Sequence, residues 1–179
     1  MDSGDKRNIV LCGFMATGKS SVGRRLAEMV HYDFLDLDAA IEADAGMSIP
    51  EIFSSKGEPE FRALESLMVE RIAEKAGCVI AAGGGTIVNP QNLARLKSSG
   101  VIITLTAEVP TILQRIGTGE DRPMLWEGDR TEKIRALLEK RKEAYSKADI
   151  ILDTSVLTID EVARQLVERL RDFGLPLQE

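Results

Sequence analysis

The residues best suited to chemistry form a glycine-rich segment, G-F-M-A-T-G-K-S, over Gly13–Ser20. An apolar run precedes it and apolar residues at helical spacing follow it, so we expect it to join a strand to a helix. Glycines there permit a tight turn whose backbone N–H groups cradle an anion, and the helix N-terminus adds partial positive charge. Lys19 would reach the β- and γ-phosphates, and the Ser20 hydroxyl would ligate Mg²⁺. The segment therefore predicts a site for a nucleoside triphosphate.

Two aspartates come next in the chain. Asp36 and Asp38 alternate with apolar residues over residues 34–38, which we interpret as a strand that carries both carboxylates on one face to the edge of a sheet. The apolar run over 78–82 ends in three glycines, where motor and switch proteins with the same loop carry an aspartate that supports Mg²⁺. Either Asp36 or Asp38 is a candidate to supply that carboxylate, while the other faces a second substrate.

Arginines are the candidates for binding further anions. Arg141 falls on the apolar stripe of its predicted helix, and Arg62 flanks the stripe of another, where a cation is costly without an anionic partner. One possibility is a protein carboxylate, such as Glu65 one turn from Arg62. The other is a forked clamp in which both arginines bind a carboxylate or phosphate of the substrate.

Residues 117–130 contain glycines, charges and one proline but show no hydrophobic period. Such a long irregular segment inside a compact domain is usually functional. Arg115 and Arg122 bracket this segment, so we expect a mobile lid that closes positive charge over the transferring phosphoryl group.

The rest of the chain supplies the elements that must position these groups. Short apolar runs recur at residues 9–12, 78–82, 101–105 and 150–152. Amphipathic segments lie between them, and capping boxes at Ser48 and Thr158 begin two of the helices. This alternation predicts a parallel sheet with helices on both faces, in a single three-layer α/β domain over residues 1–179. Ligands in such folds bind beyond the carboxyl ends of the strands, where the glycines and aspartates would gather.

Composition narrows the class of protein. Hydrophobic residues make up 44% of the 179 residues and charged residues 29%, as in soluble globular proteins, and the net charge of −6 argues against nucleic acid as the main partner. Cys12 and Cys78 lie in apolar runs and indicate buried free thiols, and one histidine leaves little room for zinc chemistry. Residues 1–8 are polar and no run has the length of a membrane span, so we expect a cytoplasmic enzyme.

Over nearly its full length the chain resembles the shikimate kinases. The motifs that carry the resemblance are G-F-M-A-T-G-K-S from Gly13, D-L-D from Asp36, S-I-P-E-I-F from Ser48, G-E-P-E-F-R-A-L-E from Gly57, G-G-G from Gly83, R-P-M-L from Arg122 and R-K-E-A-Y from Arg141. The first motif is common to a very large superfamily. The combination in this order is highly specific.

The resemblance implies a nucleoside-monophosphate-kinase-like P-loop fold with a central five-stranded parallel sheet. It also implies a substrate-binding region over about residues 36–65 and a lid over about residues 117–130. The implied activity is transfer of the γ-phosphate of ATP to the 3-hydroxyl of shikimate, with Mg²⁺ as cofactor, in chorismate and aromatic amino-acid biosynthesis. We expect ATP and shikimate to be the partners of a monomer, with no nucleic acid and no membrane.

The resemblance also assigns roles by motif position. The expected catalytic residues are Lys19, Asp38 as the candidate base, and Arg122. The expected ATP-binding residues are Ala16, Thr17, Gly18, Lys19, Ser20, Ser21, Arg115 and Arg122. The expected shikimate-binding residues are Asp38, Arg62, Gly84 and Arg141, with Ile49, Phe53, Phe61 and Glu65 lining or bracing the pocket. The expected metal ligands are Ser20 and Asp36.

Two stretches depart from the family pattern. Ala16 stands where many relatives carry glycine in the P-loop, and a small residue is tolerated there if its φ stays negative. After Asp153 and Thr154, relatives often place arginine and proline to cradle the adenine. Leu157 and Ile159 occupy that stretch here, which leaves the contacts to the base open.

Two alternatives to a shikimate kinase share part of this residue pattern. A related kinase of the gluconate or nucleoside-monophosphate type shares the P-loop, but a nucleotide acceptor needs a base-recognition pocket that the sequence does not display. A regulatory module that has lost catalysis would be expected to lack Lys19, Asp38 or a lid arginine, and all of these are present.

Overall fold

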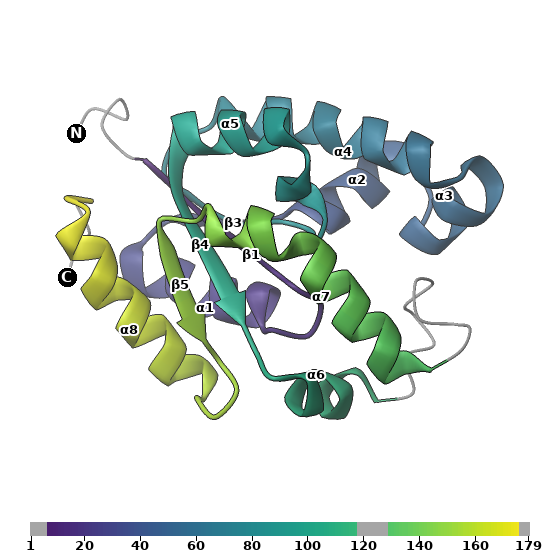
Figure 1. The fold of residues 1–179 in the computed structure, drawn as a ribbon. Helices are drawn as coiled ribbons and strands as arrows, with labels where there is room; N and C mark the ends of the chain where they lie inside the picture. The colour runs from purple at the N-terminus through teal and green to yellow at the C-terminus, as the bar shows by residue number, and fades with distance from the viewer. Residues whose placement is uncertain (1–6, 118–128, 176–179) are drawn as a thin grey trace.

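The computed structural model describes residues 7–117 and 129–175, and within them the strands form one sheet (Figure 1). Its five strands are β1 (Asn8–Gly13), β2 (Asp33–Asp36), β3 (Cys78–Ala81), β4 (Gly100–Thr106) and β5 (Ile150–Asp153). Their spatial order is β2-β3-β1-β4-β5, and every neighbouring pair is parallel. All carboxyl ends therefore lie at one edge of the sheet, as the predicted five-stranded parallel sheet requires.

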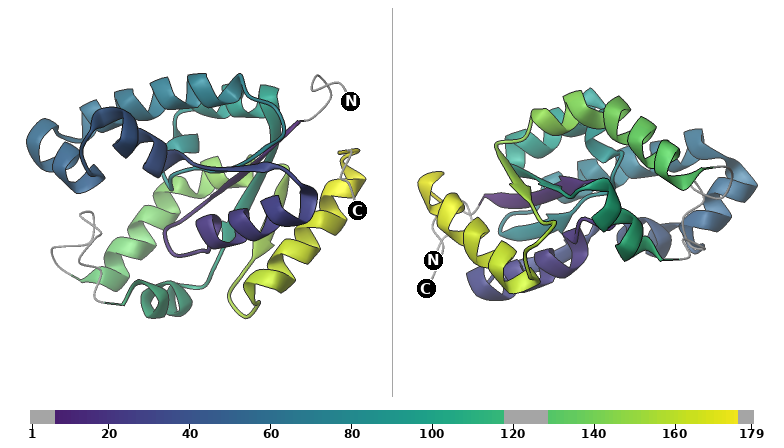
Figure 2. Two further views of the ribbon diagram at one scale, coloured as in Figure 1. Left: turned by 180° about the vertical axis from the view of Figure 1, so that it is seen from behind. Right: turned by 60° about the horizontal axis from the view of Figure 1, so that its bottom comes forward.

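Helices cover both faces of this sheet (Figures 1 and 2). One face carries α1 (Lys19–Val30) and α8 (Ile159–Asp172). The other packs against α2 (Leu37–Ala45), α3 (Ile49–Lys56), α4 (Glu58–Ala73), the 3₁₀ helix η1 (Thr86–Val88), α5 (Pro90–Ser99), α6 (Val109–Ile116) and α7 (Arg130–Ser146). Alternate side chains of β1 supply the two cores, Val10 and Cys12 on one side and Ile9 and Leu11 on the other.

The helix boundaries follow local sequence signals. Ser48 and Thr158 begin α3 and α8 with capping boxes in which both reciprocal hydrogen bonds are present, as predicted. Proline occupies the first turn of α3, α4, α5 and α6, where its missing N–H costs no helical hydrogen bond. These signals determine the residue at which each helix begins, and therefore which side chains lie at the edge of the sheet.

The predicted strand over residues 34–38 is wrong in its second half. β2 ends at Asp36, and α2, which was not predicted, begins at Leu37. The reason is capping: one Asp36 carboxylate oxygen accepts from the backbone N–H groups of Asp38 and Ala39 at 3.1 and 3.2 Å, which otherwise lack partners at a helix start. Asp38 therefore projects from the first turn of a helix and does not share a strand face with Asp36.

The condition under which alanine was expected to be tolerated at position 16, a negative φ, is not met, because the φ of Ala16 is +60°. Phe14 to Thr17 form a tight turn closed by a 3.4 Å hydrogen bond from the Thr17 N–H to the Phe14 carbonyl. Ala16 occupies the third position of this turn, where a left-handed residue is common. The left-handed conformation costs a residue with a Cβ about 1–2 kcal/mol, which the surrounding loop must offset.

Both cysteines are buried free thiols, as predicted. Burial raises the pKa of Cys12 to about 12, and it also raises the pKa of Cys78. Both groups are therefore protonated at neutral pH and act as small apolar side chains in the core.

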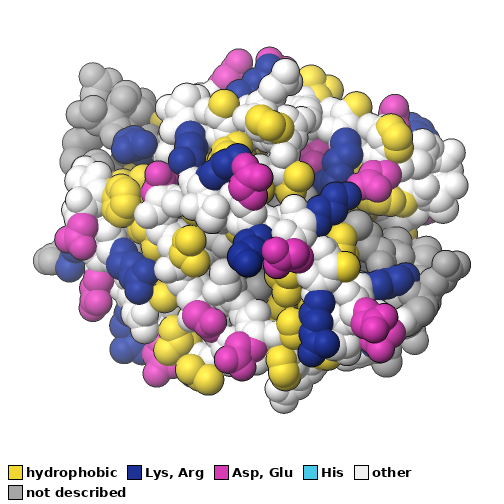
Figure 3. Space-filling model, viewed as in Figure 1, with side chains coloured by type: hydrophobic (Ala, Val, Ile, Leu, Met, Phe, Trp, Pro, Cys, Tyr) yellow, Lys and Arg dark blue, Asp and Glu magenta, His cyan; other side chains and the backbone are white. Residues whose placement is uncertain are grey.

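The surface shown in Figure 3 mixes basic and acidic side chains without a basic patch. Hydrophobic side chains are scattered among them on this face. In the described ranges, none of the helices combines the length and the apolar character that crossing a membrane requires.

Gly13, the first P-loop residue, gives a stability prediction. Its φ is +133°, and an added Cβ would lie 2.1 Å from the carbonyl oxygen of Leu105 on the neighbouring strand. We expect Gly13→Ala to lower the free energy of unfolding by about 2–6 kcal/mol, the sum of backbone strain and overpacking. Urea denaturation measures this change.

The matched control is Gly46→Ala. Gly46 has a φ of +67°, yet nothing lies within 4 Å of an added Cβ. The control should therefore lose only the backbone contribution, about 1–2 kcal/mol. Equal losses in the two variants would show that the contact with Leu105 does not constrain the loop.

Candidate active site

A cleft of about 740 Å³ opens at the edge of the sheet where the strands end. Its wall combines the P-loop, the first turns of α1 and α2, the start of α3, the buried side of α4, the glycine segment after β3 and one residue of α7. The sequence-predicted residues that line it are Ala16, Gly18, Lys19, Ser20, Ser21, Asp36, Asp38, Ile49, Phe53, Phe61, Arg62, Glu65, Gly84 and Arg141. Thr17 and Arg115 are not in this wall, and Arg122 lies outside the described residues.

The P-loop is held in shape by contacts across its own turn. The Lys19 ammonium donates to the Phe14 carbonyl at 2.8 Å, and the Thr17 hydroxyl donates to the same oxygen at 2.8 Å. Thr17 is 1% exposed, so its side chain braces the loop from within. Lys19 and Gly18 instead face the cleft, where an anion would meet the N-terminus of α1.

Ser20 and Asp36 form an oxygen pair beside the P-loop. The Ser20 hydroxyl donates to one carboxylate oxygen of Asp36 at 2.7 Å, while the other oxygen caps α2. Within residues 7–117 and 129–175, no cluster of three or more His, Cys, Asp or Glu side chains could hold a metal. The pair nevertheless fits Mg²⁺, which usually takes one or two protein oxygens and completes its shell with phosphate and water.

Asp38 is half-buried beside Gly83 at the end of β3. A Cβ placed on Gly83 would lie 3.1 Å from an Asp38 carboxylate oxygen and 3.2 Å from a Glu65 carboxylate oxygen. Because glycine has no side chain, both acids can approach the backbone at this point. Asp38 thus lies between the predicted metal pair and the wall formed by α4.

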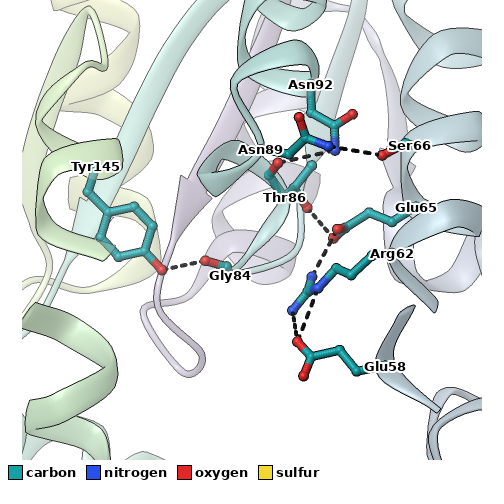
Figure 4. Close-up of polar contacts among 9 residues, drawn as sticks. All are labelled: Glu58, Arg62, Glu65, Ser66, Gly84, Thr86, Asn89, Asn92 and Tyr145. Carbon is teal, nitrogen blue, oxygen red and sulfur yellow. Dashed lines mark hydrogen bonds and ion pairs between the residues drawn. The ribbon is translucent and has the colours of Figure 1, made fainter. Parts of the chain in front are cut away.

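Arg62 does have the protein carboxylate partners that the sequence left open. Its guanidinium lies 2.9 Å from Glu65 and 3.3 Å from Glu58 (Figure 4). Burial lowers the pKa of Arg62, but the charges and hydrogen bonds of these glutamates outweigh that effect, so its pKa is raised overall. The side chain is still 31% exposed and lines the cleft, so pairing within the protein does not remove it from a ligand's reach.

Glu65 is the fixed member of this group. It is 1% exposed, and its second carboxylate oxygen accepts from the Thr86 hydroxyl at 2.7 Å (Figure 4). With both oxygens engaged, Glu65 holds Arg62 on one side and the η1 segment on the other. A buried carboxylate is tolerated here because it is paired and hydrogen-bonded.

Arg141 reaches the opposite wall of the cleft from α7. It is 6% exposed, and its guanidinium carbon lies 5.7 Å from the centre of the Phe14 ring. Its guanidinium and the Tyr145 hydroxyl, one turn later, both lie beside Gly84, at 2.9 and 3.6 Å from where a Cβ would stand. The predicted position of Arg141 on a buried stripe is therefore confirmed, and the residue places a cation across the cleft from Arg62.

Arg115 lies outside the cleft and bridges two backbone segments. Its guanidinium donates to the Ala16 carbonyl at 3.2 Å and to the Thr154 carbonyl at 2.7 Å. Its contact with nucleotide stays a prediction. Most of the predicted lid lies outside the described residues, but its two ends are joined, because the Arg130 guanidinium donates to the Gly117 carbonyl at 2.8 Å.

Three hydroxyl groups that sequence reasoning missed hold these segments together. Thr86 binds Glu65, Tyr145 donates to the Gly84 carbonyl at 2.6 Å, and the buried Thr154 hydroxyl lies 3.0 Å from the Thr17 carbonyl. Tyr145 ends the R-K-E-A-Y motif, and Thr86 and Thr154 come just after the three glycines and the last predicted strand, but no sequence pattern indicated the contacts that these hydroxyls make. Their partners lie 21 to 137 residues away in the chain.

Comparison with known proteins identifies the family. A sequence model of the shikimate kinases matches residues 15–171. The shikimate kinase of Pelotomaculum thermopropionicum is 41% identical over 168 residues, which is 94% of this chain and 98% of the relative. That of Caldanaerobacter subterraneus subsp. tengcongensis is 45% identical over 161 residues, 90% and 94% of the two chains.

A solved structure agrees with the sequence comparisons. The shikimate kinase from Acinetobacter baumannii in complex with shikimate matches with a TM-score of 0.91 and 33% identity, over 95% of this chain and 96% of that one. The predicted P-loop kinase fold is confirmed by this match and by the sheet order. The chain belongs to the shikimate kinase family.

Proposed function

We propose that this protein transfers the γ-phosphate of ATP to the 3-hydroxyl of shikimate, giving shikimate 3-phosphate and ADP. The observation that carries the proposal is that the P-loop, Asp38 and two arginines open into one cleft. Membership in the shikimate kinase family and the match to a relative solved with shikimate support the choice of acceptor.

The nucleotide side of the reaction is assigned to the P-loop. Backbone N–H groups at the start of α1 and the Lys19 ammonium would bind the β- and γ-phosphates, and so stabilise charge that develops as they separate. Ala16, Thr17, Gly18, Ser20 and Ser21 form the loop or the first helical turn. Arg115, and Arg122 from the lid, would add positive charge from outside the described cleft.

The acceptor side is assigned to the opposite part of the cleft. Arg62 and Arg141 would bind the carboxylate of shikimate from two walls, and the Gly84 backbone would contact the ring. Asp38 would accept the proton of the 3-hydroxyl as its oxygen bonds to the γ-phosphorus. The bond from that phosphorus to the bridging β–γ oxygen breaks, and ADP leaves.

Ser20 and Asp36 would hold Mg²⁺, whose charge would offset that of the phosphates. The positions of their oxygens suit this role, because the Asp36 oxygen that faces Ser20 is not the one that caps α2.

We further propose that residues 1–179 act as one domain and as a monomer in the cytoplasm, with no nucleic-acid or membrane partner.

An assay of ADP release tests the function directly. Purified protein, ATP and Mg²⁺ are mixed with shikimate, with gluconate, with AMP or with no acceptor, and the product is identified by mass. Gluconate also carries a carboxylate and hydroxyls, so the arginines alone do not exclude it. Turnover with shikimate well above the other three mixtures is expected. Equal rates in all four, or a preference for gluconate or AMP, would refute the proposal.

Asp38→Asn tests the assignment of the base. Asparagine keeps the shape but can neither accept the proton nor carry the charge, so we expect kcat to fall roughly 100-fold or more. The matched control is Asp44→Asn on the same helix, where the carboxylate pairs with Arg71 at the surface. The control should keep wild-type kcat. A rise in KM alone for Asp38→Asn would mean that the group only positions shikimate.

Arg141→Ala tests the carboxylate clamp. Loss of one buried cation should weaken shikimate binding by about 2–5 kcal/mol and leave ATP binding nearly unchanged. The control is Lys142→Ala, which removes the neighbouring cation from the solvent side of α7, where its side chain is 74% exposed. Calorimetry with each ligand measures both affinities. An equal loss for ATP would place Arg141 on the nucleotide side.

A further inference from the structure

The glycine segment after β3 separates the two arginines. A Cβ on Gly84 would lie 2.9 Å from one guanidinium nitrogen of Arg141, and a Cβ on Gly85 would lie 2.8 Å from two nitrogens of Arg62. Both guanidiniums therefore rest directly on this short stretch of backbone, one from α7 and one from α4. A shift of this backbone would therefore change the space available to both cations.

One hydroxyl ties this segment to each helix (Figure 4). On the α4 side, Thr86 donates to Glu65 at 2.7 Å, and Glu65 holds Arg62 at 2.9 Å. On the α7 side, the Tyr145 hydroxyl donates to the Gly84 carbonyl at 2.6 Å. The C=O and N–H of one trans peptide point in opposite directions, so this bond fixes the orientation of the whole peptide that follows Gly84.

Tyr145 is well placed to control Arg141. The two residues are four apart on α7 and therefore share a helix face, and both the Arg141 guanidinium and the Tyr145 hydroxyl lie beside Gly84, at 2.9 and 3.6 Å from where its Cβ would stand. The Tyr145 carbonyl also accepts from the Thr104 hydroxyl on β4 at 3.1 Å, which anchors this turn of the helix to the sheet. The Tyr145 hydroxyl thus binds the Gly84 backbone at the point where the Arg141 cation rests on it.

The Tyr145 hydroxyl keeps its proton, and so remains a hydrogen-bond donor, at neutral pH. Burial raises the pKa of Tyr145 to about 12, and the charge and hydrogen bond of Arg141 lower it only in part. The phenol is therefore protonated at neutral pH, and its proton is available to the Gly84 carbonyl. The ring is 7% exposed and belongs to the core beneath the cleft, so the hydroxyl can be removed without removing the packing.

We propose that Tyr145 is a positioning residue whose hydroxyl holds the Gly84 peptide against α7 and thereby sets the separation of Arg62 and Arg141. The inference rests on the proposed function, in which those arginines bind one carboxylate. Without the hydroxyl, the Gly84 carbonyl loses its donor, the backbone against which Arg141 rests can shift, and the two cations no longer meet a carboxylate at the distance that suits both.

The test compares Tyr145→Phe with Tyr32→Phe, the same change at the only other tyrosine in the chain. Tyr32 is 8% exposed and packs in the core on the opposite face of the sheet. Calorimetry measures the affinity of each full-length variant for shikimate, for its uncharged methyl ester and for ATP. We expect Tyr145→Phe to bind shikimate about tenfold more weakly, the factor that one buried hydrogen bond is worth.

The ratio of acid to ester affinity isolates the role of the charge. The ester cannot use the clamp fully, so the preference for the acid should fall about tenfold in Tyr145→Phe and stay unchanged in Tyr32→Phe. ATP affinity should stay within about twofold in both variants. Gly84→Ala keeps the tyrosine, but its added Cβ would displace the Arg141 guanidinium, so this variant should lower the same ratio. It provides a second measurement if Tyr145→Phe does not fold.

An unchanged acid-to-ester ratio in Tyr145→Phe and Gly84→Ala would overturn the inference. So would a parallel loss of affinity for acid, ester and ATP, because that pattern indicates general loosening of the fold. The proposed function is tested separately, by measuring the turnover of the wild-type protein with shikimate. The affinity measurements on the variants use binding alone and do not depend on phosphoryl transfer.

Discussion

The absence of side chains over residues 83–85 is the constraint on which the site depends. Around this short backbone the carboxylates of Asp38 and Glu65 and the guanidiniums of Arg141 and Arg62 all approach within about 3 Å of where a Cβ would stand. Any larger residue would displace at least one of them. The sheet makes the convergence possible, because parallel pairing brings the carboxyl ends of all five strands to one edge, where side chains from α2, α4 and α7 reach the same turn.

The two arginines on this turn are held in different ways. Arg62 already has two carboxylate partners and keeps part of its surface in solvent, whereas Arg141 is buried and lies near the face of Phe14. A ligand carboxylate that meets Arg62 must share it with Glu58 and Glu65, so the gain there is limited. Arg141 is 6% exposed, and charges interact more strongly in such a buried position than at the surface. In the proposed clamp, the two cations would therefore meet the carboxylate from unequal environments, one partly exposed and one buried.

Much of the fold was predictable because its signals are local. Apolar runs gave the strands, and the pattern around Ser48 gave a helix start to the residue. One error arose where two local patterns compete. The alternation of apolar and acidic residues suggested that the strand continues past Asp36. An aspartate at the N-cap, a helix-favouring stretch and Gly46 at the C-terminus indicate a helix instead, and the helix forms. The left-handed Ala16 and the bond from Tyr145 to Gly84, 61 residues away, depend on tertiary packing that no window of sequence displays.

The groups assigned to phosphate and metal are each held by a partner within the protein. Lys19 donates to a loop carbonyl, and Ser20 donates to Asp36, so a ligand would exchange these bonds and would not have to order the side chains. Asp36 makes a second contact, because its other carboxylate oxygen accepts a hydrogen bond from the Asp38 N–H. One carboxylate thus joins the first turn of α1 to the first turn of α2. A displacement of Asp36 at the phosphate end of the cleft would therefore also shift the backbone of Asp38. The residue that would position the metal thus also positions the proposed base.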